Sequence, residues 1–171
     1  MDITIQQATL AHTAALEKLV NSAYRGEGSK AGWTTEADLL DGQRTDKGEL
    51  AKLINRPGNT ILIALDVIGD ILGCVYLQNK GVVMYLGMLT VQPQLQAKGI
   101  GRQLLAAGEA FAKQQGCTSV EMTVISIRHE LIAWYNKHGY HFTGATRPFP
   151  TDSKFGIAKQ PLVFNVYAKD I

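Results

Sequence analysis

The chain has 171 residues, 46% of them hydrophobic, so it is long enough for one substantial core and short for two. Its 17 basic and 15 acidic residues are nearly balanced and the basic ones are scattered, which disfavours a nucleic-acid-binding surface. No stretch approaches 18 apolar residues and the first ten resemble no signal peptide, so we expect one cytoplasmic domain, residues 1–171, with no membrane segment.

Cysteine and histidine usage gives no sign of a metal site. Cys74 and Cys117 lie in apolar surroundings without CxxC spacing, which is typical of reduced thiols in cytosolic proteins. The four histidines have no ligand spacing. We therefore expect no bound metal.

The first half of the chain predicts an antiparallel sheet with covering helices. Alternating or continuous apolar runs favour strands at residues 2–7, 59–67, 70–78 and 82–91, the second and third forming a hairpin. Apolar residues at helical spacing favour a helix from a Thr9 cap to about residue 24, a short helix near 36–40 and another over 48–54.

The second half alternates helix and strand. The predicted elements are a helix over 100–115, a strand over 118–125, a helix over 128–138 and a last strand beginning near residue 162. The layout is mixed α/β, antiparallel first and then a crossover. An exposed edge on the last strand would let a second copy pair with it, giving a homodimer.

A short basic turn, "VQPQLQAKGIGRQLL" at residues 91–105, joins the end of one predicted strand to the start of a helix. Helix N-termini present unpaired N–H groups and bind anions, and glycines permit close approach of a phosphate. Lys98 and Arg102 would add positive charge there. The alternative is an ordinary loop whose glycines only permit positive φ.

Two segments together resemble the GCN5-related N-acetyltransferase (GNAT) superfamily. "LTVQPQLQAKGIGRQLL" places Gln96, Gly99 and Gly101 at the signature positions, and "AWYNKHGYHFTG" follows one helix and one strand later. The resemblance implies an α/β (α+β) fold with a twisted, mostly antiparallel sheet of about seven strands and about four helices. It also implies that acetyl-CoA lies in a split between the fourth and fifth strands.

The resemblance further implies which residues contact coenzyme A. The pantetheine amides would bond to strand backbone near Leu89 and Val91, and the diphosphate would lie on the glycine turn. The implied cofactor-binding residues are Leu89, Val91, Gln96, Ala97, Lys98, Gly99, Gly101, Arg102 and Arg128. Arg128 stands where many members carry asparagine, so the cofactor contact there differs.

Tyr135 is the candidate catalytic residue, because it matches the tyrosine that members carry before the KxGY turn. Its phenol would protonate the leaving thiolate, while a backbone N–H near Val91 would stabilise the oxyanion. Read without the resemblance, it would be a core tyrosine of an amphipathic helix. Tyr85 occupies the position of the glutamate base in histone-acetylating members, which disfavours that mechanism.

Two segments would form the acceptor pocket: residues 26–44 and the later "ATRPFP". Their candidate acceptor-binding residues are Trp33, Glu36, Arg44 and Arg147. The arginines could pair with a substrate carboxylate and Glu36 could accept an amine proton, unless these segments form only a packed lid with surface arginines.

The favoured function is N-acetylation of a small amino-acid-like amine. The alternatives are a protein lysine or N-terminal acetyltransferase and a non-catalytic acyl-CoA-binding module.

Overall fold

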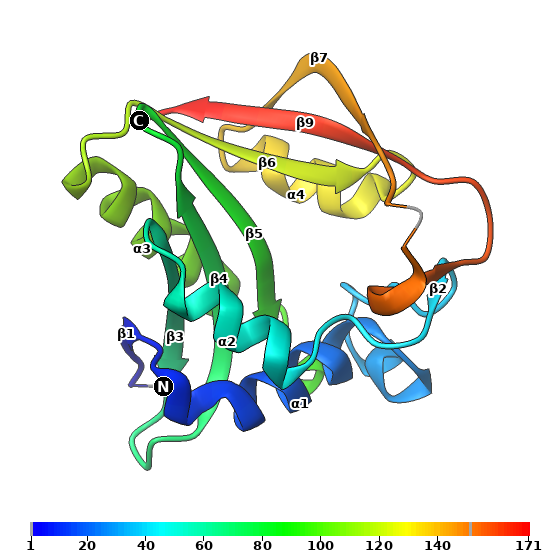
Figure 1. Ribbon diagram of the computed structural model, residues 1–171, viewed down its shortest axis with the longest axis horizontal. Helices are drawn as coiled ribbons and strands as arrows, with labels where there is room; N and C mark the ends of the chain where they lie inside the picture. The colour runs from blue at the N-terminus through cyan, green and yellow to red at the C-terminus, as the bar shows by residue number, and fades with distance from the viewer. Residues whose placement is uncertain (1, 151) are drawn as a thin grey trace.

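The computed structural model describes residues 2–150 and 152–171, which are built around one seven-stranded sheet (Figure 1). In spatial order its strands are β1 (Thr4–Gln7), β3 (Asn59–Leu65), β4 (Ile71–Asn79), β5 (Val83–Val91), β6 (Ser119–Ile125), β9 (Val163–Asp170) and β7 (His141–Pro148). Neighbouring strands are antiparallel except β5 and β6, which are parallel. This mixed sheet confirms the predicted fold class.

Four α-helices cover the two faces of the sheet. Helices α1 (Thr13–Tyr24) and α2 (Lys47–Asn55) pack on one face, and α3 (Ile100–Gln114) and α4 (His129–Lys137) on the other. The shorter elements are η1 (Leu10–His12), η2 (Glu27–Ala31), η3 (Pro93–Leu95), η4 (Ser153–Phe155) and the two-stranded sheet of β2 (Leu40–Asp41) with β8 (Ile157–Ala158).

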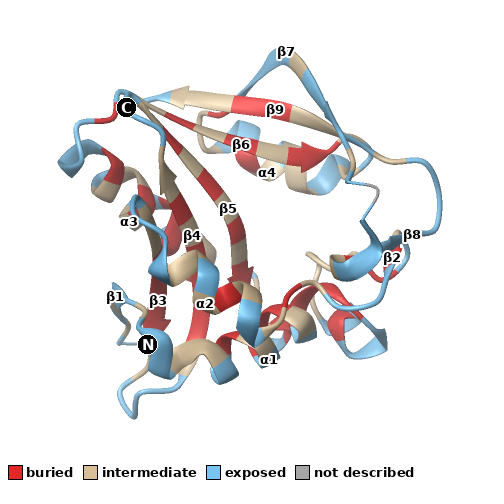
Figure 2. Ribbon diagram, in the orientation of Figure 1, coloured by how far each residue is buried: buried red, intermediate tan, exposed pale blue. Residues whose placement is uncertain are grey.

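Strand alternation explains the two cores. In β3, Ile61 and Ile63 face α1 and α2, whereas Leu62 and Ala64 face α3. Successive side chains of a strand point to opposite faces, so a continuous apolar run is what a strand covered on both sides requires. Figure 2 shows the resulting buried stripe through the central strands.

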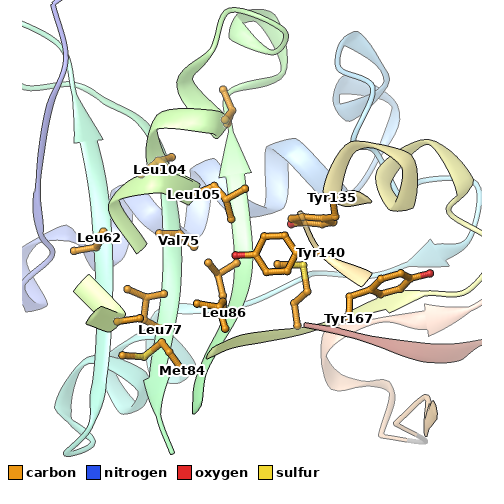
Figure 3. Close-up of a cluster of buried hydrophobic side chains, with 14 of the residues drawn as sticks. Leu62, Val75, Leu77, Met84, Leu86, Leu104, Leu105, Tyr135, Tyr140 and Tyr167 are labelled. Atoms are coloured by element: carbon orange, nitrogen blue, oxygen red, sulfur yellow. The ribbon is translucent and has the colours of Figure 1, made fainter. Parts of the chain in front are cut away.

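The larger core lies beneath α3. Leu104 and Leu105 point from that helix onto Leu62, Val75 and Leu86 of the sheet (Figure 3). Both α3 leucines are buried, and burying such a side chain contributes about 1.5–3 kcal/mol each. The helix that follows the glycine turn is therefore fixed firmly to the sheet.

The sheet opens between β5 and β6. Only three residue pairs join these strands, the last being Tyr85 with Glu121, and beyond them the strands diverge (Figure 1). Two features accompany the divergence: a register shift of β5 against β4, and Met88 at a positive φ of 51°. Counted along the main sheet, this split falls between the fourth and fifth strands, as expected.

Two predictions about the fold were wrong, one about a helix and one about an edge of the sheet. Residues 36–40 form turns that lead into β2 instead of a helix, because Leu40 and Asp41 pair with Ala158 and Ile157 of β8. The last strand, β9, has no free edge, because β7 pairs with its outer side. Strand β7, at the edge of the sheet, was not predicted.

In the described part of the chain, no helix combines the length and the apolar composition needed to cross a bilayer.

Candidate active site

The glycine turn ends β5 and begins α3. Gly99 is the N-cap of α3 with φ of +87°, a conformation that favours glycine. Gln103 N–H donates to the Gly99 carbonyl and makes the first hydrogen bond of the helix. The N–H groups of residues 100–102 have no backbone acceptor in the described part of the chain, so they can bind a ligand. Lys98 and Arg102 are exposed beside the turn.

A cavity of about 210 Å³, the turn cavity, lies against this turn. Its walls come from the turn, the end of β5, α4 and the loop after η2. They include most of the predicted cofactor-binding residues, namely Leu89, Val91, Gln96, Ala97, Gly99, Gly101 and Arg102. Two of the predicted residues, Lys98 and Arg128, are not among its lining residues.

Gly101 faces directly into the turn cavity. A Cβ atom placed there would lie 3.7 Å from the Val91 side chain and 3.8 Å from Trp134, both of which line the cavity. These are ordinary van der Waals distances, so the absence of a side chain keeps space open for a ligand and is not needed for packing.

Trp33 belongs to the turn cavity and not to the acceptor side where we had placed it. It lines that cavity opposite Trp134, with ring centroids 6.4 Å apart. The loop after η2 carries it there because Thr34, its neighbour, is bonded to Gln96 of the turn.

A second cavity of about 380 Å³, the split cavity, occupies the opening between β5 and β6. Its lining includes Glu36, Arg44 and Arg128, and on the far side Phe149, Pro150 and Phe164. Arg147 does not line it: this exposed residue of β7 donates only to the carbonyl of neighbouring Thr146. The segment "ATRPFP" thus reaches the cavity through Phe149 and Pro150.

A buried ion-pair cluster forms one wall of the split cavity. Arg25 Nη1 lies 2.5 Å from Glu36 Oε1, and Arg128 Nη1 lies 3.3 Å from Glu36 Oε2. All three side chains are at most 12% exposed. Arg128 Nη2 also donates to the Thr34 carbonyl at 2.6 Å, and Arg25 Nη2 to the Phe155 carbonyl at 3.1 Å.

This cluster changes two sequence expectations. Arg128 turns toward Glu36 and the split cavity, so its side chain is not placed for a coenzyme A contact in the turn cavity. Glu36 has each carboxylate oxygen paired with a guanidinium, which suits an anchor for two arginines better than an acceptor of an amine proton.

The two cavities meet at four residues. Tyr24, Leu89, Leu131 and Tyr135 line both. Tyr135 is buried, and in residues 2–150 and 152–171 no group hydrogen-bonds to its hydroxyl. Burial raises the pKa of Tyr135 above its ordinary value, so this phenol keeps its proton at neutral pH.

Tyr24 is a junction residue that sequence reasoning missed. Its hydroxyl donates to the carbonyl of Leu89, and burial is the main cause that raises its pKa. Its position at the end of the first predicted helix was the available signal, but only the fold shows that α1 ends beside β5.

Arg25, Tyr85 and Phe164 were also missed as lining residues, and Phe149 was included only as part of the segment "ATRPFP". Tyr85 spans the base of the split, where its hydroxyl lies 3.2 Å from Thr123 Oγ1 of β6.

Across the described residues no cluster of His, Cys, Asp and Glu could hold a metal ion.

Comparison with known proteins identifies the family to which this chain belongs. Solved acetyltransferases share the fold over nearly the whole chain. The family model described as the acetyltransferase (GNAT) family matches residues 13–140, and the chain belongs to this family of acyl-CoA-dependent N-acetyltransferases, which use acetyl-CoA.

Three solved structures illustrate the likeness. A GNAT-family acetyltransferase from Staphylococcus aureus Mu50 has 16% identity and a TM-score of 0.71, with 99% of each chain covered. The ribosomal-protein-S18-alanine N-acetyltransferase of Escherichia coli has 15% identity and a TM-score of 0.73, covering 99% of this chain and 94% of that one. The PaiA N-acetyltransferase of Thermoplasma acidophilum, in complex with coenzyme A, has 19% identity and a TM-score of 0.70, with both chains fully covered.

At these identities the structures establish the fold alone. No protein with a curated description matches the sequence significantly.

Proposed function

We propose that this protein transfers the acetyl group of acetyl-CoA to the amine of a small acceptor bearing a carboxylate. One observation carries the proposal: the turn cavity and the split cavity meet at Tyr135. An acyl donor in the first and an amine in the second would therefore meet beside a buried, protonated phenol.

The turn cavity fits coenzyme A. Gly99 and Gly101 leave space at the N-terminus of a 15-residue helix, whose free N–H groups and positive dipole end favour a diphosphate. Arg102 lines this cavity and Lys98 is exposed on the same turn, so both add positive charge near it. Beyond Tyr85, no strand in the described part of the chain pairs with the edge of β5 that faces β6. The carbonyls of Leu89 and Val91 already accept from Tyr24 and Gln96, so it is the N–H groups of these two residues that can bond to the pantetheine amides.

The proposed chemistry needs one protonated group at the junction. Acetyl-CoA supplies an activated thioester. The acceptor nitrogen forms a bond to the acetyl carbon as the carbon–sulfur bond breaks, and the Tyr135 hydroxyl gives its proton to the departing sulfur. The proton that the acceptor nitrogen loses restores the phenol, so the products are the amide and the free thiol.

The charge of the split cavity favours an anionic acceptor. Its ionic lining groups are the guanidinium groups of Arg25, Arg44 and Arg128 and the carboxylates of Glu36 and Asp152, which leaves one net positive charge. A basic peptide tail would be repelled by this balance. Tyr85, where histone-acetylating members carry a glutamate base, supports the same conclusion.

We propose a cytoplasmic location and no dimer through β9. Both cysteines are buried and free, in keeping with a reducing cytoplasm. The outer edge of β9, through which we expected a homodimer, is covered by β7, so we propose no dimer through that edge.

The test is a screen of amines with acetyl-CoA that follows release of free thiol. We expect turnover with amino acids or their derivatives and none with lysine-containing peptides. Turnover confined to peptides would contradict the proposal, as would tight acetyl-CoA binding without transfer to any amine.

A further inference from the structure

The three arginines of the split cavity are not equivalent. Arg25 and Arg128 are held by Glu36, and each also donates to a backbone carbonyl. For Arg44, by contrast, no carboxylate lies within 4.0 Å in the described part of the chain. Arg44 is the guanidinium of this cavity that is left to bind a ligand.

Arg44 is also held near the junction. Its Cζ atom lies 5.9 Å from the centre of the Tyr24 ring, and Tyr24 lines both cavities. A cation over an aromatic face is attracted to the ring, which limits the positions of this half-buried side chain. An anion bound by Arg44 would lie within the split cavity, close to the residues that line both cavities.

The cavity wall farther from the turn is aromatic. The rings of Phe149 and Phe164 are 5.1 Å apart and tilted by only 31°, and Phe155 lines the same cavity. They come from three segments, the end of β7, β9 and η4, which the fold brings together. A volume of about 380 Å³ is large for an acceptor of only a few atoms.

We propose that the acceptor carries both a carboxylate and a flat apolar group, as an aromatic amino acid does. This inference rests on the proposed function. Arg44 binds the carboxylate, the Phe149–Phe164 pair packs against the ring, and the amine faces Tyr135. No carboxylate in the described part of the chain holds the Arg44 guanidinium, so its N–H groups can make a bidentate contact.

Three acceptors of graded structure test it: phenylalanine, phenethylamine, which lacks the carboxylate, and alanine, which lacks the ring. We expect kcat/KM for phenylalanine to exceed that of either other amine by about tenfold or more, since a charged hydrogen bond and a buried ring each contribute above 1.4 kcal/mol. Binding of phenylalanine to the protein with coenzyme A, measured by calorimetry, gives a readout independent of turnover.

Two variants test which residues bind the carboxylate and the ring of the acceptor. Arg44→Gln should raise KM for phenylalanine about 10-fold or more with little change in kcat, and leave phenethylamine unaffected. Phe164→Ala should remove the preference for phenylalanine over alanine. Arg147→Gln, on the exposed side of β7, is the matched control and should change neither. Unaltered acetyl-CoA affinity shows that each variant is folded.

The outcomes separate the two proposals. If alanine is acetylated as well as phenylalanine, this inference is overturned and the proposed function stands. If phenethylamine is acetylated as well as phenylalanine, the carboxylate is overturned in both proposals and only acetyl transfer to a small amine stands. If Arg44→Gln and Arg147→Gln behave alike, Arg44 does not bind the carboxylate. If acetyl-CoA binds but no free amine is acetylated, the proposed function itself fails.

Discussion

Gln96 and Thr34 are bonded to each other through both ends of the glutamine amide. Gln96 Nε2 donates to Thr34 Oγ1 at 2.7 Å, and Thr34 N–H donates to Gln96 Oε1 at 3.2 Å. Gln96 Nε2 also donates to the Val91 carbonyl at 3.1 Å. The side chain at the first signature position of the glycine turn is thus fully engaged within the protein and fixes the turn to the loop that carries Glu36.

Thr34→Val should therefore disturb both cavities. The change removes the Oγ1 acceptor at nearly constant volume and should lower the free energy of unfolding by about 1 kcal/mol. The backbone carbonyl of Thr34 accepts from Arg128, so a loop displaced by the substitution would also move that arginine. We therefore expect KM to rise for acetyl-CoA and for the acceptor. Thr118→Val, whose hydroxyl contacts the Val82 carbonyl away from both cavities, is the control. A rise in only one KM would show that the loop does not couple the cavities.

Tyr135→Phe should affect catalysis and Tyr140→Phe should affect stability, although the two side chains are neighbours. Their ring centroids lie 5.8 Å apart and both residues are buried. Tyr135→Phe should lower kcat about 100-fold or more and keep the stability, because its hydroxyl has no bond to lose in the described part of the chain. Tyr140→Phe loses a 2.8 Å bond to Glu109 and should be less stable with unchanged kcat.

Steady-state kinetics and urea unfolding on both variants provide the measurement. A Tyr135→Phe enzyme with full kcat and reduced stability would identify this residue as part of the core only.

Gly101→Leu should abolish acetyl-CoA binding in a folded protein, because its side chain would extend into the turn cavity from a position where Cβ itself meets no clash. Gly101→Ala should weaken binding less. Calorimetry gives the affinities and circular dichroism the fold. Gly28→Ala controls for a general effect of replacing glycine, because Gly28 lies outside both cavities, has no positive φ and has open space around a Cβ atom. Equal affinities for Gly28→Ala and Gly101→Leu would remove the turn from the proposal.

Glu36→Ala should be among the most destabilising single changes at the site. It leaves Arg25 and Arg128 buried without their shared carboxylate, and breaking a buried ion pair in this way costs about 3–5 kcal/mol. Glu27→Ala removes an exposed ion pair with Lys30 and should leave the urea midpoint unchanged. Similar midpoints for the two variants would mean that the cluster is well solvated in solution.

Alkaline pH should destabilise the protein through its buried tyrosines. Burial is the main cause that raises the pKa of Tyr24, Tyr135 and Tyr140 in the folded state, whereas an unfolded tyrosine ionises near pH ~10. Their stabilisation is thus complete below pH ~10 and is lost as the pH rises through the folded pKa values, by about 1.4 kcal/mol per pH unit for each group.

Urea unfolding at pH 8, 10 and 11 checks this expectation. Tyr140→Phe should reduce the alkaline slope by one group's share. Equal stability at pH 8 and 11 would contradict it.

Local sequence patterns predicted those parts of the fold that depend on local preference. The apolar run around Ile61 to Ala64 required a strand buried on both faces, and Gly99 marked the start of α3. Strand β7 could not be predicted from the sequence. Nearly all its residues are exposed, so its sequence shows no alternation of apolar and polar residues.

Partners distant in sequence were beyond prediction. Arg128 stands where a different contact was expected, and its partner Glu36 is 92 residues away along the chain. The helix expected near residues 36–40 fails for the same reason, since β2 pairs with a segment more than 115 residues later. The sequence predicted one pocket for Arg44 and Glu36, and both line the split cavity, but which guanidinium is left without a carboxylate partner depends on the folded cluster.

The three-pair junction of β5 with β6 has a consequence for amide hydrogen exchange. Amides on the part of β5 beyond Tyr85 that point toward β6 have no strand acceptor, so their protons should exchange early, whereas those of the paired end at Val83–Tyr85 should be protected. A pantetheine arm bonded along that edge would slow the same amides. Deuterium uptake of peptides covering residues 86–92, with and without coenzyme A, would thus footprint the bound ligand directly, before any acceptor is identified.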